Sequence, residues 1–264
     1  MSVELSSSGA GIERFCNGET DLATSGRLIK DEEAATCADA SVEYDALEVA
    51  YDGIAVVVNP AIDFVTCMTV DQLAQLWAPD STVATWQDLD SAWPAEEIAL
   101  HFRGEDSGTY HFFTQAIVGE EGSSRDDYTV HDSHSDVAEA VVNGENAFGV
   151  LPFPRYLEVQ DDVTLIEVDG GDGCVAPSPE TILDASYAPL SRPLFLYVKR
   201  ESLGRPEVAA FLGFYLADHV AFAEAAGLVA DPDQTVQADL QTKLDAAIAG
   251  TSNPDGPEVA TPTS

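Results

Sequence analysis

Short apolar runs alternate with amphipathic stretches along most of this 264-residue chain. The apolar runs have the length and composition of buried strands, and they cover residues 21–25, 47–59, 98–102, 147–151 and 194–198. Apolar residues at helical spacing predict helices that begin near residues 8, 70 and 136 and others over about 206–217, 219–226 and 234–248. Alternating strands and helices predict an α/β fold.

Capping residues and composition refine this pattern. Residues 69–72 form a capping box, in which two side chains satisfy free backbone N–H groups at a helix start. Ser135 or Asp136 is expected to cap a later helix. Residues 161–186, rich in glycine, aspartate and proline, are expected to form a loop, and residues 251–264 a disordered tail.

The polar stretch at residues 103–109 separates an apolar, strand-like run from a helical pattern. The free N–H groups of a first helical turn favour an anion. Ser107 and Thr109 add hydroxyl donors to that turn. Gly108 allows a ligand to approach the backbone, and Arg103 adds a guanidinium. These residues predict an oxyanion site, and the alternative is an ordinary polar turn.

The chain is strongly acidic, with 47 acidic and 11 basic residues and a net charge of −36. This balance argues against nucleic acid or anionic membranes as partners. It suits high salt, where self-repulsion is screened, so we favour a salt-adapted source over an ordinary acidic secreted protein. No apolar run approaches the roughly 18 residues of a membrane span, and residues 1–5 lack the features of a signal peptide.

Four cysteines occur, and they are Cys16, Cys37, Cys67 and Cys174. No two of them form a C-x-x-C motif, which argues against a structural zinc site. The even number fits two disulfides in an oxidising compartment, and buried free thiols are the alternative.

Four segments, in the same order, resemble the phosphate-binding proteins of ABC transporters. SGAG at residues 8–11 and FCNGETDL at residues 15–22 are similar to that family's SGTGGGF-x-x-FCxGETDI segment. Further along the chain, three segments resemble the family's strand into the hinge, its phosphate loop and its return crossing, and they cover residues 49–60, 106–109 and 189–195. The resemblance extends over about residues 3–230.

The resemblance implies a type II periplasmic-binding fold, in which two α/β lobes flank a central cleft. The chain is expected to cross between the lobes at two hinges, near residues 58–62 and 188–193. Lobe one would then comprise residues 1–59 and 193–264, and lobe two residues 60–192.

The resemblance also implies a set of phosphate ligands. Ser8 matches a hydroxyl ligand at the start of the family's first helix, and residues 107–109 match the donors of the second lobe. Arg103 matches an arginine that some relatives use, with Glu105 expected to hold it in place. Arg27 is expected at the surface or in lobe packing, and a role in the cleft is the alternative.

Two departures from the family bear on the site. Relatives read ASRPI or ASDAP where this chain reads SGRLI at residues 25–29, so Gly26 occupies the position of a Ser or Asp ligand. An Asp there would accept the proton of monohydrogen phosphate, which sulfate lacks, and Ser25 is the expected substitute here. The family's first strand, phosphate loop and helix are also absent, so lobe one is expected to be incomplete.

The resemblance implies a Cys16–Cys37 disulfide, which leaves Cys67 and Cys174 as the second pair. It further implies an extracytoplasmic binding protein without a cofactor and without catalysis, and a monomer if the chain is complete. Its partners would be inorganic phosphate and an ABC permease.

Other interpretations use the same residues. One is a degenerate or partial relative with a structural or surface role, and another is a phosphate-ester hydrolase, although we identify neither a nucleophile with an adjacent base nor a metal pair. The segment at residues 105–108 evokes the nucleophile of serine proteases, but no histidine lies well upstream of it. His131 and His134, with Asp132, could bind a metal weakly, and an exposed polar loop is the favoured interpretation.

We expect salt to stabilise the fold, because 47 acidic side chains repel one another at low ionic strength and salt screens this repulsion. Thermal melts between about 0.05 M and about 2 M KCl should show a rising melting temperature. A flat or falling melting temperature would contradict the salt-adapted interpretation.

Overall fold

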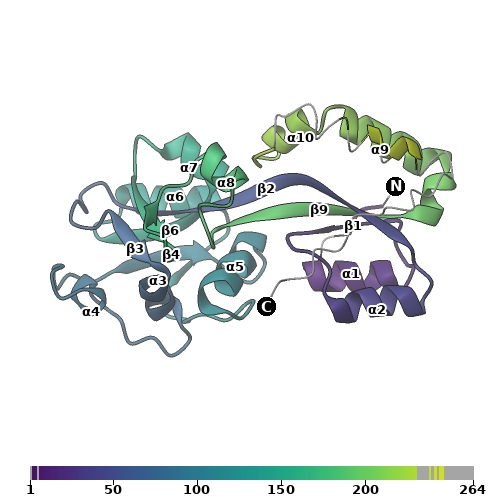
Figure 1. Cartoon of the computed structure of the whole chain (residues 1–264). Coiled ribbons are helices and arrows are strands. Elements are labelled where there is room, and N and C mark those ends of the chain that lie inside the picture. Colours follow the sequence, from purple (N-terminus) through teal and green to yellow (C-terminus); the bar gives the residue numbers. More distant parts are fainter. Residues whose placement is uncertain (1, 5, 231–237, 239–240, 243, 247–264) are drawn as a thin grey trace. The chain divides into compact units, whose positions relative to one another are not determined.

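The computed structural model describes the chain except for residues 1, 5, 231–237, 239–240, 243 and 247–264 (Figure 1). The expected tail at 251–264 lies outside the described residues, as does most of the expected helix at 234–248. The chain divides into two compact units. Unit 1 comprises Met1–Val49, Leu194–Phe222 and Asp231–Ser264, and unit 2 comprises Ala50–Pro193 and Ala223–Ala230.

The first change of unit occurs earlier in the chain than expected. Strand β2 (Tyr44–Val58) passes from unit 1 to unit 2 within its length, so residues 50–59 belong to unit 2 and not to lobe one. The reason is hydrogen bonding, because the second half of β2 pairs with β6 (Ala147–Pro152) and β7 (Thr164–Asp169) of unit 2. The chain passes from unit 2 back to unit 1 after Pro193, within β9 (Ser191–Lys199).

A third segment, residues 223–230, also belongs to unit 2, although the sequence assigned it to lobe one. Backbone pairing explains this assignment as well. Tyr51 donates to the carbonyl of Val229 at 2.6 Å, and Val229 donates back to Tyr51 at 2.9 Å.

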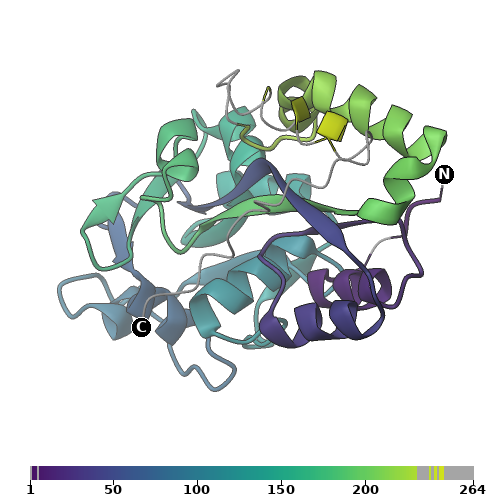
Figure 2. The same ribbon diagram turned by 45° about the vertical axis from the view of Figure 1, so that its right-hand side comes forward.

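In unit 1, helices cover both faces of a sheet in which β9 lies between β2 and β1 (Leu22–Ser25) and is antiparallel to β1 (Figures 1 and 2). Alternate side chains of β9 point to opposite faces. Leu196 and Val198 pack in the cluster formed with α9 (Pro206–Ala217). Phe195 and Tyr197 pack in the cluster formed with α1 (Ser8–Cys16) and α2 (Asp31–Asp39). The unit also contains the 3-10 helix η2 (Arg200–Gly204) and α10 (His219–Ala225), which begins in it.

In unit 2, β2 lies beside β6, and β6 lies beside β4 (Ala99–Arg103), which in turn pairs with β5 (Thr129–His131). Strands β6, β4 and β5 run parallel. Two short strands pair with β7. They are β3 (Cys67–Thr69), which is parallel to it, and β8 (Cys174–Val175), which is antiparallel to it. The helical elements of this unit are α3 (Val70–Trp77), α4 (Trp86–Leu89), α5 (Gly108–Phe113), the π-helix η1 (Thr114–Val118), α6 (His134–Asn143), α7 (Phe153–Val159) and α8 (Pro179–Leu183).

The same alternation divides the core of unit 2. Ile54, Val56 and Val58 of β2 belong to the large cluster that contains the aromatic side chains of α3 and α5. Ala55 and Val57, one position out of phase, belong to the cluster formed with α6. All five side chains are fully buried, so the apolar run at 47–59 is a strand covered on both faces in this part.

Local signals predicted some element ends and missed others. Thr69 and Gln72 form the expected capping box at α3. The cap of α6 is Ser133, not Ser135 or Asp136, because the Ser133 hydroxyl accepts from the Asp136 N–H at 3.1 Å. The expected loop at 161–186 contains β7, β8 and α8, and its glycines lie in the connection between β7 and β8.

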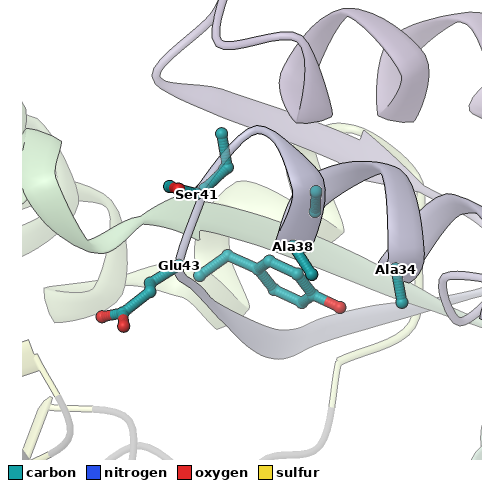
Figure 3. Close-up of a pocket in the computed structure, with 7 residues that line it drawn as sticks. Ala34, Ala38, Ser41 and Glu43 are labelled. Atoms are coloured by element: carbon teal, nitrogen blue, oxygen red, sulfur yellow. The ribbon is translucent and has the colours of Figure 1, made fainter.

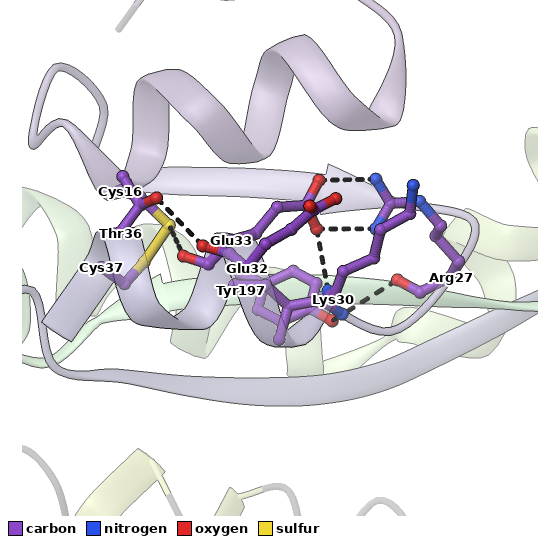
Figure 4. The surroundings of a disulfide bond; sticks show 9 residues. Cys16, Arg27, Lys30, Glu32, Glu33, Thr36, Cys37 and Tyr197 are labelled. Carbon is purple, nitrogen blue, oxygen red and sulfur yellow. Dashed lines mark hydrogen bonds and ion pairs between the residues drawn. A yellow bond between two sulfur atoms is a disulfide. The ribbon is translucent and has the colours of Figure 1, made fainter.

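Both disulfides join the cysteines that were expected to pair. Cys16 and Cys37 link α1 to α2, with their Cα atoms 4.2 Å apart (Figure 4). Cys67 and Cys174 link β3 to β8 across a sequence separation of 107 residues. In a chain-entropy account, closing such a long loop constrains the unfolded chain the most.

Within the described residues, no single helix is both long and apolar enough to cross a membrane, and only α9 and α10 taken together, bent by 76°, pass that test on length and composition.

A buried arginine fastens the segment before β5 to α3. The Arg125 backbone N–H donates to the carbonyl of Trp77, and its Nη1 donates to the carbonyls of Leu76 and Val83 at 3.0 and 2.9 Å. Its remaining guanidinium nitrogens bind Asp127. The carbonyls of Leu76 and Trp77 lie in the last turn of α3, where no intrahelical donor is available, so Arg125 caps that helix.

We expect Arg125→Leu to lower the free energy of unfolding by about 3 kcal/mol, because it leaves two buried carbonyls without a donor at about 1–3 kcal/mol each. Urea unfolding at fixed salt measures this loss. Arg14→Leu is the matched control, since Arg14 is a half-exposed side chain paired with Glu4. If Arg125→Leu lowers the free energy of unfolding no more than the control does, Arg125 does not hold this segment to α3.

Candidate functional site

The predicted oxyanion segment has the expected local structure. Arg103 is the last residue of β4, and Ser107 caps α5, with its buried hydroxyl accepting from the Tyr110 N–H at 3.4 Å. A β-carbon built on Gly108 would meet no atom within 4 Å, so the backbone is open at that point. The four unit 2 residues predicted from the sequence therefore lie in one short stretch that extends from the end of β4 to the first turn of α5.

The guanidinium of Arg103 is held by a different residue from the one expected. Its Nη2 donates to Oδ2 of Asp106 at 2.8 Å, whereas Glu105 offers its backbone carbonyl to His111. The Arg103 side chain is only 14% exposed. Its Nε is buried and has no partner in the described part of the chain. An unpaired, buried N–H of a cation is costly, so this atom is a candidate donor to a bound anion.

The two unit 1 candidates differ in how fully their hydroxyls are used. Ser8 begins α1, but Ser7 is the residue that caps it. The Ser8 hydroxyl accepts from the Gly26 N–H at 3.2 Å, and among the described residues its hydrogen has no acceptor. The Ser25 hydroxyl donates to the carbonyl of Arg27 at 2.8 Å and accepts from the Arg27 N–H at 3.2 Å. Both the hydrogen and the oxygen of the Ser25 hydroxyl are therefore used within its own turn.

Arg27 forms a two-point ion pair with Glu33 of α2, at 2.8 and 2.7 Å (Figure 4). The hydrogen bonds from Arg27 lower the pKa of the Glu33 carboxyl, and Glu33 also accepts from the Lys30 N–H at the start of α2. The pair thus fastens the turn after β1 to α2, in keeping with a packing role for Arg27.

A pocket of about 420 Å³ in unit 1 lies beside α2 and the start of β2 (Figure 3). Apolar side chains and the carboxylate of Glu43 contribute to its walls, and the lining residues are Ala34, Cys37, Ala38, Ser41, Val42, Glu43 and Tyr44. A lining without a cation and with an acidic side chain does not fit an oxyanion.

Two further residues, which the sequence did not assign to the anion site, lie close to Arg103. His134 begins α6, and its Nε2 is 3.4 Å from the hydroxyl of Thr109. Its Nδ1 is buried and has no partner among the described residues. Burial, with the positive charges of Arg103 and Arg155, lowers the pKa of His134 to about 4, so its ring is neutral at neutral pH.

Arg155 is the second residue. It lies in α7 directly after β6, and it is paired with Glu158 three residues later. Its Nε is buried without a partner in the described structure, as is that of Arg103. Both guanidiniums act on the His134 ring, which places all three residues in one neighbourhood.

The three elements that carry these residues follow parallel neighbours in one sheet. Strands β6, β4 and β5 end at the same edge, and α7, α5 and α6 begin there. Ligand sites in such sheets lie at the carboxyl ends of the strands. The strand order could not be read from single segments, which is why the sequence predicted the loop after β4 but missed His134 and Arg155.

The weak metal site suggested by His131, Asp132 and His134 does not form. The Nε2 of His131 lies 3.0 Å from Nδ1 of His101 on the neighbouring strand, while His134 contacts Thr109. Across the described part of the chain, no group of three or more His, Cys, Asp or Glu residues is arranged to hold a metal ion.

A fold of two α/β units with a polar site at a strand edge is typical of solute-binding proteins, and the family comparison agrees. The chain belongs to the PBP superfamily, because the model of a PBP superfamily domain matches residues 1–219.

Individual relatives have more specific names than the superfamily does. Protein SphX of Synechocystis is 38% identical over 237 residues, which are 89% of this chain and 70% of the relative. Phosphate-binding protein PstS of Staphylococcus haemolyticus is 34% identical over 235 residues, 88% of this chain and 72% of the relative. A crystal structure described as a possible phosphate binding protein from Planctomyces limnophilus matches with 35% identity and a TM-score of 0.84, over 91% of this chain and 85% of that one.

We expect His134 to make the fold less stable as the pH falls. The ordinary pKa of histidine is 6.5 and that of folded His134 is about 4, so between these values the unfolded chain binds the extra proton. The contribution of His134 is thus fully present above about pH 6.5 and is lost as the pH decreases towards about 4.

His134→Gln cannot titrate and should lose less stability than the native chain between about pH 7 and about pH 5. Urea unfolding of both proteins at the two pH values measures the difference. Equal losses would mean that His134 is not held neutral.

Proposed function

We propose that this chain is an extracytoplasmic solute-binding protein that captures inorganic phosphate and delivers it to an ABC permease. The observation that carries the proposal is the buried, unpartnered Nε of Arg103 at the carboxyl edge of a parallel sheet, beside the start of α5. Several relatives are named phosphate-binding proteins, and their similarity supports phosphate as the anion.

The unit 2 residues offer the donors that a tetrahedral oxyanion needs. Arg103 supplies a charged N–H, and charge-assisted hydrogen bonds of this kind are about twice as strong as neutral ones. The backbone N–H groups of Gly108 and Thr109 belong to the first turn of α5, where no helical carbonyl is available to them. The hydroxyls of Ser107 and Thr109 each carry a hydrogen that can be directed to the ligand.

In unit 1 we propose Ser8 as the stronger candidate ligand. Its hydroxyl oxygen already accepts from Gly26, which leaves the hydrogen for an anion. Ser25 would have to release the carbonyl of Arg27 before it could donate to a ligand. Ser25, whose role rests on the family resemblance, is therefore the less favoured of the two candidate ligands.

The two disulfides fit a location outside the reducing cytoplasm. We propose binding without catalysis. The contact between the Thr109 hydroxyl and His134 is the arrangement that a nucleophile and its base would need, but the lowered pKa of His134 makes the ring a poor general base near neutral pH. The contact between Thr109 and His134 therefore does not favour a phosphate-ester hydrolase.

Arg103→Ala and Ser107→Ala should each weaken phosphate binding. Loss of one charge-assisted hydrogen bond costs about 1.5–3 kcal/mol, which is roughly a 10- to 150-fold loss of affinity. Titration calorimetry with inorganic phosphate on the full chain measures it.

Arg14→Ala serves as the control for loss of a positive charge, since Arg14 lies on α1 and is paired with Glu4. Melting temperatures of all variants show whether each still folds. Unchanged affinity in both Arg103→Ala and Ser107→Ala would refute the site.

A further inference from the structure

Arg155 repeats the local chemistry of Arg103. Each arginine is found where a strand of the parallel set ends, Arg103 at the end of β4 and Arg155 three residues after β6. Each guanidinium pairs with a carboxylate three residues further on, Asp106 for one and Glu158 for the other. Each keeps a buried Nε without a partner among the described residues. A repeated arrangement of this kind at one sheet edge points to a shared ligand.

The register of the strands brings the two arginines to that common edge. Strand β4 pairs in parallel with β6, with Ala99 opposite Ala147 and His101 opposite Gly149. Continuing this register puts residue 103 of β4 opposite residue 151, so Arg103 and the start of α7 lie at the same end of neighbouring strands. The α7 helix is short, and the inference rests on the Arg155 side chain and not on the helix terminus.

We propose that Arg155 is a second anion-binding residue of unit 2, which acts with Arg103 on the same oxyanion. This inference rests on the proposed function. Arg155 lies outside the segments whose resemblance to the family implies phosphate ligands. Two guanidiniums on one anion favour a doubly charged ligand, because each supplies a full positive charge in a partly desolvated site.

The groups around His134 support this charge preference. The two guanidiniums and the carboxylate of Asp106 act electrostatically on the ring, and the hydroxyl of Thr109 lies 3.4 Å from its Nε2. Because its pKa is lowered to about 4, His134 adds no charge near neutral pH, and the charged groups of the site are the two guanidiniums and their carboxylate partners, Asp106 and Glu158. The dianion of phosphate, which forms as the pH rises through neutrality, is attracted by the Arg155 guanidinium more strongly than the monoanion is.

The test compares Arg155→Gln, Arg155→Lys and the native chain by titration calorimetry with inorganic phosphate, at about pH 8 and about pH 5. We expect Arg155→Gln to bind about 10- to 100-fold more weakly at the higher pH and to lose less at the lower pH. Arg155→Lys keeps the charge but not the planar fork, so its affinity should fall between those of Arg155→Gln and the native chain.

Arg205→Gln is the matched control, because Arg205 is half-exposed and paired with Asp21 and Glu207 in unit 1. It should bind as the native chain does. If Arg155→Gln also binds as the native chain does, while Arg103→Ala is weakened, the role of Arg155 is wrong and the proposed function stands. If the native chain itself does not bind phosphate, both are wrong. A melting temperature equal to that of the native chain separates a binding defect from misfolding, and Arg155→Lys provides the second variant if Arg155→Gln does not fold.

Discussion

The parallel direction of three neighbouring strands determines where the chemistry of unit 2 gathers. Strands β6, β4 and β5 end at one edge of the sheet, so whatever follows each strand meets there. Arg155 follows β6, Arg103 and the start of α5 follow β4, and His134 follows β5. These residues are up to 52 positions apart, and only the hydrogen-bond ladder unites them. An antiparallel β5 or β6 would send its following residues to the opposite edge.

The contrast between a net charge of −36 and the proposed anion site is explained by distance and burial. Exposed carboxylates more than about 10 Å away are largely screened at moderate salt. The cations of the site are partly buried, with Arg103 only 14% exposed, and they act at short range in a medium of lower dielectric constant. Their carboxylate partners, Asp106 and Glu158, hold them in position and leave the Nε–H of each without a partner among the described residues. The acidic surface therefore sets solubility and salt response, whereas the site depends on a few local groups.

Local patterns predicted the elements well because each depends on neighbouring residues. The run at 98–102 with the polar turn at 103–109 predicted β4, the turn and α5. The loop expected at 161–186 was wrong, because Ile166 and Val168 alternate with polar residues over too short a span to outweigh the glycines around them. Strand order and register are long-range properties, so no local signal revealed that β5 and β6 flank β4. For the same reason Arg155 was missed altogether, and His134 was considered only as part of a metal site.

The most direct test of the central claim is nuclear magnetic resonance of the full chain during a phosphate titration, observing backbone amides together with arginine Nε–H groups. We expect the largest shifts at the amides of Gly108 and Thr109 and at the Nε–H groups of Arg103 and Arg155, because these atoms would donate to the anion. Arg125, whose Nε already binds Asp127, should remain unchanged and serves as an internal reference. The account would be contradicted if phosphate caused no shifts, or if the signals of residues at the common edge of β6, β4 and β5 did not shift.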